Sequence, residues 1–253
     1  MTAPLFYSDE LPSGVERGDS IGVGGEVAHH AVRVRRIAPG ESIILSDGAG
    51  LGASCSVLRA DPDRMSLSVD AVVRETPADQ QFVLVQSLAK ADRDLQAIES
   101  ATEIGADAII PLAAQRSIVS WPAKRAAKSQ AKWKSTVRAA AQQSRRLWLP
   151  KVLALHTPKQ LAALIADQPD VGAVVLHEDA TLPFATFGRE LKARQSGQTL
   201  LIVGPEGGFG DEELELFTAA GATTAKLGPH VLRSSTAGPV ALSVLLAAIG
   251  RWD

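Results

Sequence analysis

The pattern of apolar runs changes near residue 76, and this change restricts the possible folds more than any other feature of the chain. From residue 20 to about 74, short apolar runs are closely separated by Gly, Pro and Asp. This spacing predicts the short strands of a small β-barrel or sheet, with one or two helical turns over residues 29–37. After a polar segment, 76–81, strand-like and helix-like patterns alternate, as in an α/β domain with a mainly parallel sheet. We therefore predict two domains, residues 1–75 and 76–253.

The second domain has one strand or helix after another. The patterns predict strands at 82–88, 107–113, 171–178, 199–204 and 223–228. They predict helices over 92–104, where Gly105 ends the helix, over 123–146, and over about 236–249. In the long helix, Lys124, Lys128 and Lys132 share one face, whereas Trp133, Val137, Ala140 and Ser144 line another. We expect the first face to be solvated and the second to pack.

Composition excludes several classes of protein. The chain of 253 residues is 45% hydrophobic and 21% charged, which is typical of a folded globular protein and not of a disordered one. A single cysteine, Cys55, excludes an intramolecular disulfide and a cysteine-rich zinc site. The N-terminus lacks a signal-peptide pattern, and the longest apolar run, 239–249, is too short to span a membrane. A cytoplasmic protein without membrane association is expected.

The charge is unevenly distributed along the chain. Its net value is −2, yet residues 76–150 hold 11 basic and 6 acidic groups, and no acid occurs between Ala108 and Ala166. Trp121, Trp133 and Trp148 also lie in this basic segment. Such a one-signed region is typical of proteins that bind a phosphate backbone, although a solvated helix face is the simpler interpretation.

The most unusual segment follows the strand predicted at 199–204. It reads Gly-Pro-Glu-Gly-Gly-Phe-Gly-Asp from Gly204 to Asp211, with four glycines in seven residues before a predicted helix. Glycines let the backbone approach a ligand closely, and ligands of open α/β sheets bind beyond the carboxyl ends of the strands. The segment matches neither a phosphate P-loop nor G-x-G-x-x-G. A ligand-binding loop and a tight turn are the two interpretations.

A second loop, residues 227–237, follows the last predicted strand. Arg233 is the only charged residue between Lys226 and Arg251. A lone arginine beside an apolar helix can assist helix capping, but we favour a role in holding a substrate phosphate or base.

Three other patterns are excluded as sites. Residues 18–22 match G-x-S-x-G without the strand and helix that a nucleophile elbow requires. The glycines at 48–52 lie between predicted strands and are interpreted as a turn. The five histidines have no metal-ligand spacing with carboxylates, so no metal site is expected.

Several separated blocks together resemble a known family. GPEGGFGDEE and LGPHVLRSSTA lie near the C-terminus, LAKAD with ATEIG lies at 88–105, and QSRR precedes Pro150. In the first domain, HHAVRVRRIAPG is followed by LSDG. Their order is similar to that of the SPOUT-class methyltransferases that form N3-methyluridine in bacterial small-subunit ribosomal RNA, the RsmE type. The resemblance covers nearly the whole chain.

The resemblance implies a fold, a cofactor and partners. The fold would be an α/β trefoil-knotted SPOUT methyltransferase domain preceded by a small PUA-like RNA-binding β-barrel. The cofactor would be S-adenosylmethionine, and the partners would be 16S ribosomal RNA in the small ribosomal subunit and a second copy in a homodimer. The implied cofactor-binding residues are Leu176, His177, Glu178, Gly204, Pro205, Glu206, Gly207, Gly208, Leu227, Gly228, Pro229, Val231, Leu232 and Thr236.

The resemblance also suggests roles for individual residues. Arg233 is the expected catalytic residue, stabilising the developing uridinate or its phosphate. The family more often has an acid at the position of Ser235, so no general base is assigned there; Glu206 is a weaker candidate base, since it can simply accept backbone hydrogen bonds. The expected RNA-binding residues are His30, Arg35, Arg36, Lys90, Arg93, Lys124, Lys128, Lys132, Arg145 and Arg146. Two alternatives stay open: a ribose 2′-O-methyltransferase and a non-catalytic RNA-binding assembly protein.

Overall fold

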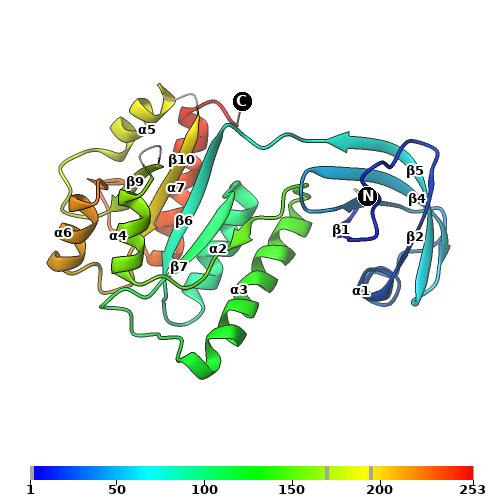
Figure 1. Ribbon diagram of the computed structural model, residues 1–253, viewed down its shortest axis with the longest axis horizontal. Helices are drawn as coiled ribbons and strands as arrows, with labels where there is room; N and C mark the ends of the chain where they lie inside the picture. Colours follow the sequence, from blue (N-terminus) through cyan, green and yellow to red (C-terminus); the bar gives the residue numbers. More distant parts are fainter. Residues whose placement is uncertain (1–2, 169–170, 194–195, 253) are drawn as a thin grey trace. The chain divides into compact units, whose positions relative to one another are not determined.

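A computed structural model describes residues 3–168, 171–193 and 196–252. The chain forms two compact units (Figure 1). The first contains Met1–Pro77 together with Ala141–Leu149, and the second contains Ala78–Ala140 and Pro150–Asp253. The short segment 141–149 thus belongs with a unit whose other residues lie far earlier in the sequence.

The first unit is built on one five-stranded sheet that forms a PUA-like half-barrel. Its strands are β1 (Leu5–Tyr7), β2 (Ser20–Gly24), β3 (Ser42–Ser46), β4 (Leu51–Ala60) and β5 (Arg64–Arg74), in the order β1-β3-β4-β5-β2. The β1–β3 pair is parallel, and the others are antiparallel. Alternate side chains of β3 and β5, among them Ile43, Leu45 and Leu67, are fully buried in its core. The predicted β-rich first domain is confirmed.

Two details of this unit differ from prediction. The helical segment begins at Gly25, not at residue 29, and consists of α1 (Gly25–His29) and the π-helical turn η1 (His30–Val34). Its small buried residues, Ala28 and Ala31, give too weak an apolar pattern to mark its start. Strand β1 was not predicted, because three residues are too few for a period-2 pattern.

Segment 141–149 joins the first unit through side-chain to backbone hydrogen bonds and close packing. Tyr7 Oη donates to the carbonyl of Arg146 (2.7 Å), and Ser46 Oγ donates to the carbonyl of Leu147 (3.0 Å). A Cβ at Gly52, in β4, would lie only 2.6 Å from Leu147 Cδ2, so a larger residue there would force Leu147 to shift. Gly48 and Gly50 lie in the turn between β3 and β4, as interpreted from the sequence.

The second unit contains a six-stranded, fully parallel sheet in the order β11-β9-β10-β6-β7-β8. The strands are β6 (Gln80–Ser87), β7 (Ala108–Leu112), β8 (Lys151–Val152), β9 (Val171–Leu176), β10 (Gly197–Val203) and β11 (Thr223–Ala225). The helices are α2 (Arg93–Ile104), α3 (Ala123–Gln143), α4 (Pro158–Ala166), α5 (Phe184–Lys192), α6 (Asp211–Ala219) and α7 (Ser234–Ala248).

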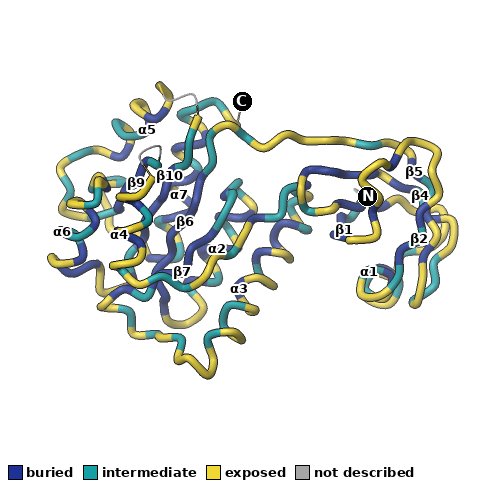
Figure 2. The backbone as a smooth tube through the Cα atoms, viewed as in Figure 1, coloured by how far each residue is buried: buried dark blue, intermediate teal, exposed yellow. Residues whose placement is uncertain are grey.

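Helices cover both faces of this sheet (Figure 1). Helices α2 and α7 pack against each other and against β6, while α4 and α6 cover the opposite face. The central strands β6 and β10 are consequently buried, as the dark tube in Figure 2 shows. The predicted parallel α/β domain is confirmed. The trefoil knot that the resemblance implies stays a prediction.

Three helix ends locate the residues of interest. Helix α2 ends at Gly105 (φ 136°), as predicted. Helix α3 ends at Gln143, so the prediction of a helix to 146 was wrong; Arg145 adopts a left-handed φ of 57°, which a continuing helix excludes. Helix α7 begins at Ser234, earlier than predicted.

No helix in the described ranges is long and apolar enough to cross a membrane.

Candidate active site

A cavity of about 840 Å³ lies at the carboxyl ends of β9, β10 and β11. Three loops line it: residues 177–183 after β9, the glycine loop (residues 204–210) after β10, and the arginine loop (residues 226–233) after β11. This is the edge at which open α/β sheets bind ligands. The two loops singled out from the sequence therefore meet at one cavity.

Most of the predicted cofactor-binding residues line this cavity together with Arg233. They are Leu176, His177, Glu178, Gly204, Pro205, Glu206, Gly207, Gly208, Leu227, Gly228, Pro229, Val231 and Leu232. Thr236 is the exception: it is exposed on the first turn of α7, and Ser234 and Ala237 line the cavity instead. The helix begins at 234, and this start directs residue 236 away from the cavity.

The side chain of Glu206 fastens the glycine loop to the loop after β6. Its Oε1 accepts hydrogen bonds from Arg93 Nη1 (3.1 Å) and from the backbone N–H of Lys90 (3.3 Å). Both charged side chains are mostly buried at this point. The interpretation that this carboxylate accepts backbone hydrogen bonds is confirmed. Arg93, expected to bind RNA, lines the cavity as an ion-pair partner.

Two further residues, not anticipated from the sequence, hold the other side of the glycine loop. Arg116 Nη1 donates to the carbonyl of Gly207 (3.2 Å). The carboxylate of Glu213 is buried at the start of α6 and accepts from the N–H groups of Gly210 (3.0 Å) and Gln115 (2.9 Å). A glutamate three residues after the N-cap is a helix-start signal, and this signal was available in the sequence.

The loop after β6 has an unusual backbone. Ala91 and Asp92 both adopt left-handed φ angles of 55°, a conformation that costs energy for non-glycine residues. Asp94, which follows, is buried, and its burial raises the pKa of the carboxyl group above its usual range. Its Oδ2 accepts from the backbone N–H of Ala89 (3.4 Å), which helps to hold this loop. This backbone places the N–H of Lys90 and the side chain of Arg93 within hydrogen-bond distance of Glu206.

Arg233 is the N-cap residue of α7 and lies in extended conformation at the cavity. Its side chain is exposed, and within the described ranges it makes no hydrogen bond or ion pair. Its backbone carbonyl accepts the N–H groups of Thr236 and Ala237. The guanidinium group is therefore available to a ligand, next to the positive end of a helix.

The predicted basic face of α3 is exposed, and its opposite face is buried. Trp133, Val137 and Ala140 pack inward, and the rings of Trp133 and Trp121 meet edge to face at 5.3 Å. A groove of about 840 Å³ runs along the exposed face, lined in part by Arg125, Lys128 and Lys132. Lys132 Nζ forms an ion pair with Asp92 Oδ1 at 2.9 Å.

One of the remaining RNA-binding candidates, Lys124, lies in the second unit, and the others lie in the first unit. Lys124 is exposed on α3. In the first unit, Arg35 and Arg36 are exposed just after η1, and His30 packs edge to face on Phe6 at 5.8 Å. Arg145 and Arg146 follow α3, in segment 141–149. The structure thus places these candidates in several separate groups.

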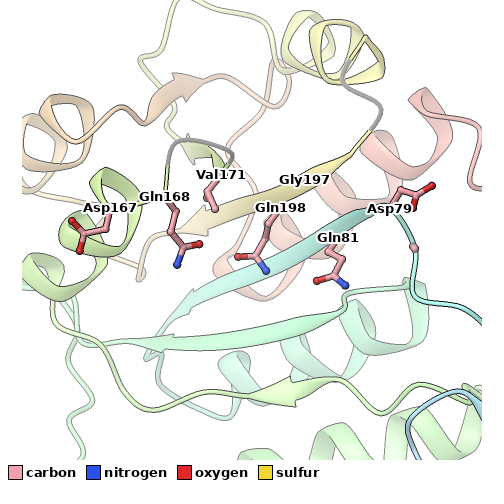
Figure 3. Close-up of a pocket in the computed structure, with 8 residues that line it drawn as sticks. Asp79, Gln81, Asp167, Gln168, Val171, Gly197 and Gln198 are labelled. Atoms are coloured by element: carbon pink, nitrogen blue, oxygen red, sulfur yellow. The ribbon is translucent and has the colours of Figure 1, made fainter.

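A second hollow, of about 500 Å³, lies where β6, β9 and β10 begin (Figure 3). Side-chain amides and carboxylates dominate its lining, which consists of Ala78, Asp79, Gln81, Asp167, Gln168, Val171, Gly197 and Gln198. It contains none of the predicted site residues. In the described part of the chain, no three His, Cys, Asp or Glu side chains gather as a metal site.

Comparisons with known proteins match both units. Residues 76–246 match the family model of an RNA methyltransferase domain, and residues 23–70 match that of an RNA methyltransferase PUA domain. Ribosomal RNA small subunit methyltransferase E of Mycobacterium bovis is 40% identical over 255 aligned positions, covering 100% of this chain and 95% of that protein. The chain belongs to the ribosomal RNA small subunit methyltransferase E family. The Bacillus subtilis member is 33% identical, with coverage of 95% and 94%.

Two solved methyltransferase structures share this fold. The Neisseria gonorrhoeae member, solved bound to S-adenosyl methionine, has a TM-score of 0.83 and 25% identity, covering 97% of this chain and 98% of that one. A Legionella pneumophila methyltransferase in complex with the same cofactor has a TM-score of 0.84 and 26% identity, covering 98% of each chain. The family that the sequence blocks indicate is confirmed, as is a parallel-sheet methyltransferase domain preceded by a PUA-like half-barrel.

Proposed function

We propose that this methyltransferase E family member transfers a methyl group from S-adenosylmethionine to N3 of a uridine in 16S ribosomal RNA of the small subunit. The observation that carries the proposal is the cavity at the carboxyl ends of β9, β10 and β11, where the glycine loop and the arginine loop meet. Relatives of the same fold are solved with the cofactor bound.

The residues of the cavity fit the cofactor. A Cβ built on Gly208 or Gly228 would meet no atom within 4 Å, so both glycines face open space in which a ligand can approach the backbone. The volume of about 840 Å³ lies within the range of small-molecule sites. The lining segments 176–178, 204–208 and 227–232 would hold the cofactor, which supplies a methyl carbon activated by its bond to a positively charged sulfur.

Methylation at N3 requires that the imide proton leaves and that the nitrogen faces the methyl carbon. The negative charge that develops on the uracil needs a positive partner, and Arg233 is an exposed cation at the cavity whose side chain has no hydrogen bond or ion pair in the described ranges. Glu206 is held by Arg93 and Lys90, so we assign it to loop positioning instead of proton removal.

RNA binding is assigned to exposed cations in both units. Lys124, Lys128 and Lys132 on α3 would contact phosphates, as would Arg35 and Arg36 after η1. Such contacts position the RNA without reading its sequence. The supporting observation is the groove on α3, in which Arg125, Lys128 and Lys132 lie beside serine and threonine hydroxyls.

We further propose a homodimer and a cytoplasmic location. Val240 and Val244 are 38% and 36% exposed at i and i+4 on α7, and Val231 in the arginine loop is 75% exposed. A second copy of the chain would cover these exposed apolar side chains, of which Val231 lines the cavity. Light scattering of the wild type and of the Val240→Glu/Val244→Glu variant tests the proposed dimer, and a monomeric wild type would refute it.

The proposed cytoplasmic location follows from the ribosomal substrate and fits a lone, buried thiol at Cys55.

The decisive experiment combines the purified protein with methyl-labelled S-adenosylmethionine and small ribosomal subunits that lack the modification. The RNA is then digested and the labelled nucleoside identified by mass spectrometry. N3-methyluridine is the expected product. A methyl group on ribose would indicate the 2′-O-methyltransferase alternative, and RNA binding without transfer would indicate a non-catalytic assembly protein.

A further inference from the structure

A buried amide and a buried hydroxyl meet at the first turn of α7, next to the cavity. Gln86, on β6, and Ser234, the first residue of α7, are 0% and 7% exposed. Gln86 Nε2 donates to Ser234 Oγ at 2.8 Å and to the carbonyl of Ser87 at 3.1 Å. Ser234 also lines the cavity, between Arg233 and Ala237.

The carbonyl of Ser87 fixes the direction of these hydrogen bonds. A carbonyl oxygen only accepts, so the nitrogen of the Gln86 amide, and not Oε1, belongs beside it. The same nitrogen lies beside Ser234 Oγ, which must therefore accept as well. The Oε1 atom of Gln86 is left without a partner in the described ranges. A buried oxygen without a hydrogen bond costs free energy, and such a group in a folded protein often has a functional role.

The hydroxyl hydrogen of Ser234 is consequently free to donate. The structure provides no acceptor for it among the described residues, although the side chain is nine-tenths buried. Arg233 beside it is a second donor that lines the cavity, and both residues lie at the positive N-terminal end of α7. Donors therefore gather at this end of the cavity, and such a group suits an oxygen that gains negative charge.

We propose that Ser234 donates its O–H to O4 of the uracil, the carbonyl oxygen beside N3 that cytosine lacks, and that Gln86 is the positioning residue that keeps Ser234 a donor. This inference rests on the proposed function. As the N3 proton passes to an acceptor and then to solvent, the charge left on N3 spreads to both neighbouring carbonyl oxygens, where Ser234 stabilises it. The N3 electron pair then forms the bond to the methyl carbon, and the electrons of the carbon–sulfur bond return to sulfur.

This hydrogen bond also discriminates between bases. Cytosine has an amino group where uracil has O4, and its N3 carries no proton to lose. A buried donor directed at a carbonyl is left unpaired when the ligand presents another donor, which disfavours binding. Ser234 is thus a specificity-determining residue for a pyrimidine with carbonyl groups on both sides of N3.

The test measures the single-turnover rate of N3-methyluridine formation on small subunits, and separately the Kd for S-adenosylmethionine by calorimetry. Ser234→Ala is expected to lower the rate by about 10²-fold, the effect of removing one donor to a developing anion, and to leave the Kd unchanged. Ser234→Thr keeps the hydroxyl and should restore most of the rate. Ser235→Ala, one residue further along and outside the cavity lining, is the matched control and should equal the wild type.

Gln86→Glu tests the positioning role, because an ionised carboxylate only accepts and would take the Ser234 hydrogen. The double variant Gln86→Glu/Ser234→Ala should then be no slower than Ser234→Ala alone, a coupling that a general loss of stability would not produce.

Three results would overturn the inference. An undiminished rate in Ser234→Ala refutes the hydroxyl's role while leaving the proposed function intact. A raised Kd with an unchanged rate at saturating cofactor assigns the hydroxyl to the cofactor. A wild-type enzyme that forms no N3-methyluridine refutes the proposed function and this inference together.

Discussion

Arg93 Nη1 donates to Glu206 Oε1 at 3.1 Å, and this ion pair joins the loop that opens α2 to the glycine loop. The two residues lie 113 positions apart in the sequence. Because the glycine loop has few side chains of its own, its position depends on such contacts from its neighbours. The ion pair therefore helps to preform the cavity that the glycine loop lines.

Breaking this ion pair should weaken cofactor binding more than it changes the methyl-transfer rate. Glu206→Gln keeps an acceptor for the N–H of Lys90 but loses the charge that Arg93 contacts. We expect about a fivefold rise in the Kd for S-adenosylmethionine, corresponding to about 1 kcal/mol for a partly exposed pair. Calorimetry measures the Kd. Adding Arg93→Gln to Glu206→Gln should have little further effect, and fully additive losses would contradict the pairing.

Glu213 should stabilise the fold through its two backbone hydrogen bonds. Glu213→Ala leaves the buried N–H of Gly210 and the N–H of Gln115 without their acceptor, so the free energy of unfolding should fall by about 2–3 kcal/mol. Glu213→Gln retains one acceptor oxygen and should lose less. Urea unfolding measures both variants, with the exposed neighbour Glu212→Ala as control. Equal stability of Glu212→Ala and Glu213→Ala would refute this role.

Arg233 should act on the reaction and not on cofactor affinity. Arg233→Ala removes a cation that lines the cavity without an ion-pair partner, and we expect the rate of methyl transfer to fall by about 10²-fold or more. The Kd for S-adenosylmethionine should stay the same. Arg189→Ala, which alters an exposed arginine outside the cavity lining, serves as control. A variant that turns over as fast as the wild type would exclude the assigned role.

The lysines of α3 should differ in their contribution to RNA binding. Lys124→Ala and Lys128→Ala should each lower the salt dependence of RNA affinity by about one phosphate contact. Lys132 forms an ion pair with Asp92, so Lys132→Ala should have a smaller effect and Asp92→Asn should strengthen binding. Filter binding over a range of KCl concentrations measures the slopes. Lys159→Ala on α4 is the control, and identical slopes for all variants would contradict the assignment.

Cys55 should make stability fall at high pH. Burial, and secondly the nearby charge of Asp70, raise the pKa of its thiol from 9.0 to about 11. Below pH 9.0 the thiol is protonated in both the folded and the unfolded chain; between 9.0 and about 11 only the unfolded chain releases the proton, so stability is lost as pH rises. Urea unfolding across this window should show a steeper loss for the wild type than for Cys55→Ala. Parallel curves would refute the prediction.

The sequence predicts the second unit well because its strands are buried on both faces and end in recognisable loops. Arg233 and the glycines of 204–210 could be identified for that reason, since the ends of parallel strands meet at one edge. Gln86 and Arg116 could not, because their roles depend on partners 148 and 91 positions away. Glu213 has a local helix-start signal, but its hydrogen bond to Gln115, 98 positions away, has none. A buried glutamine in an apolar strand has no distinguishing local pattern.

The placement of segment 141–149 also lay beyond the sequence pattern. The residues continue the basic, helical character of 123–143, and nothing local marks their contact with Tyr7, 139 positions earlier. Only packing distances reveal that Leu147 and Trp148 fit the space left by Gly52 and Gly50.

The interrupted course of the first unit has a consequence for its synthesis. Residues 1–77 leave the ribosome first, but the segment that covers Gly50 and Gly52 follows only after residue 140. The first unit is therefore complete only after residue 149 has been translated, and until then its glycine turn is uncovered. An isolated fragment ending at residue 77 would leave Gly50 and Gly52 uncovered, and a gene cut at that point would yield an incomplete first unit.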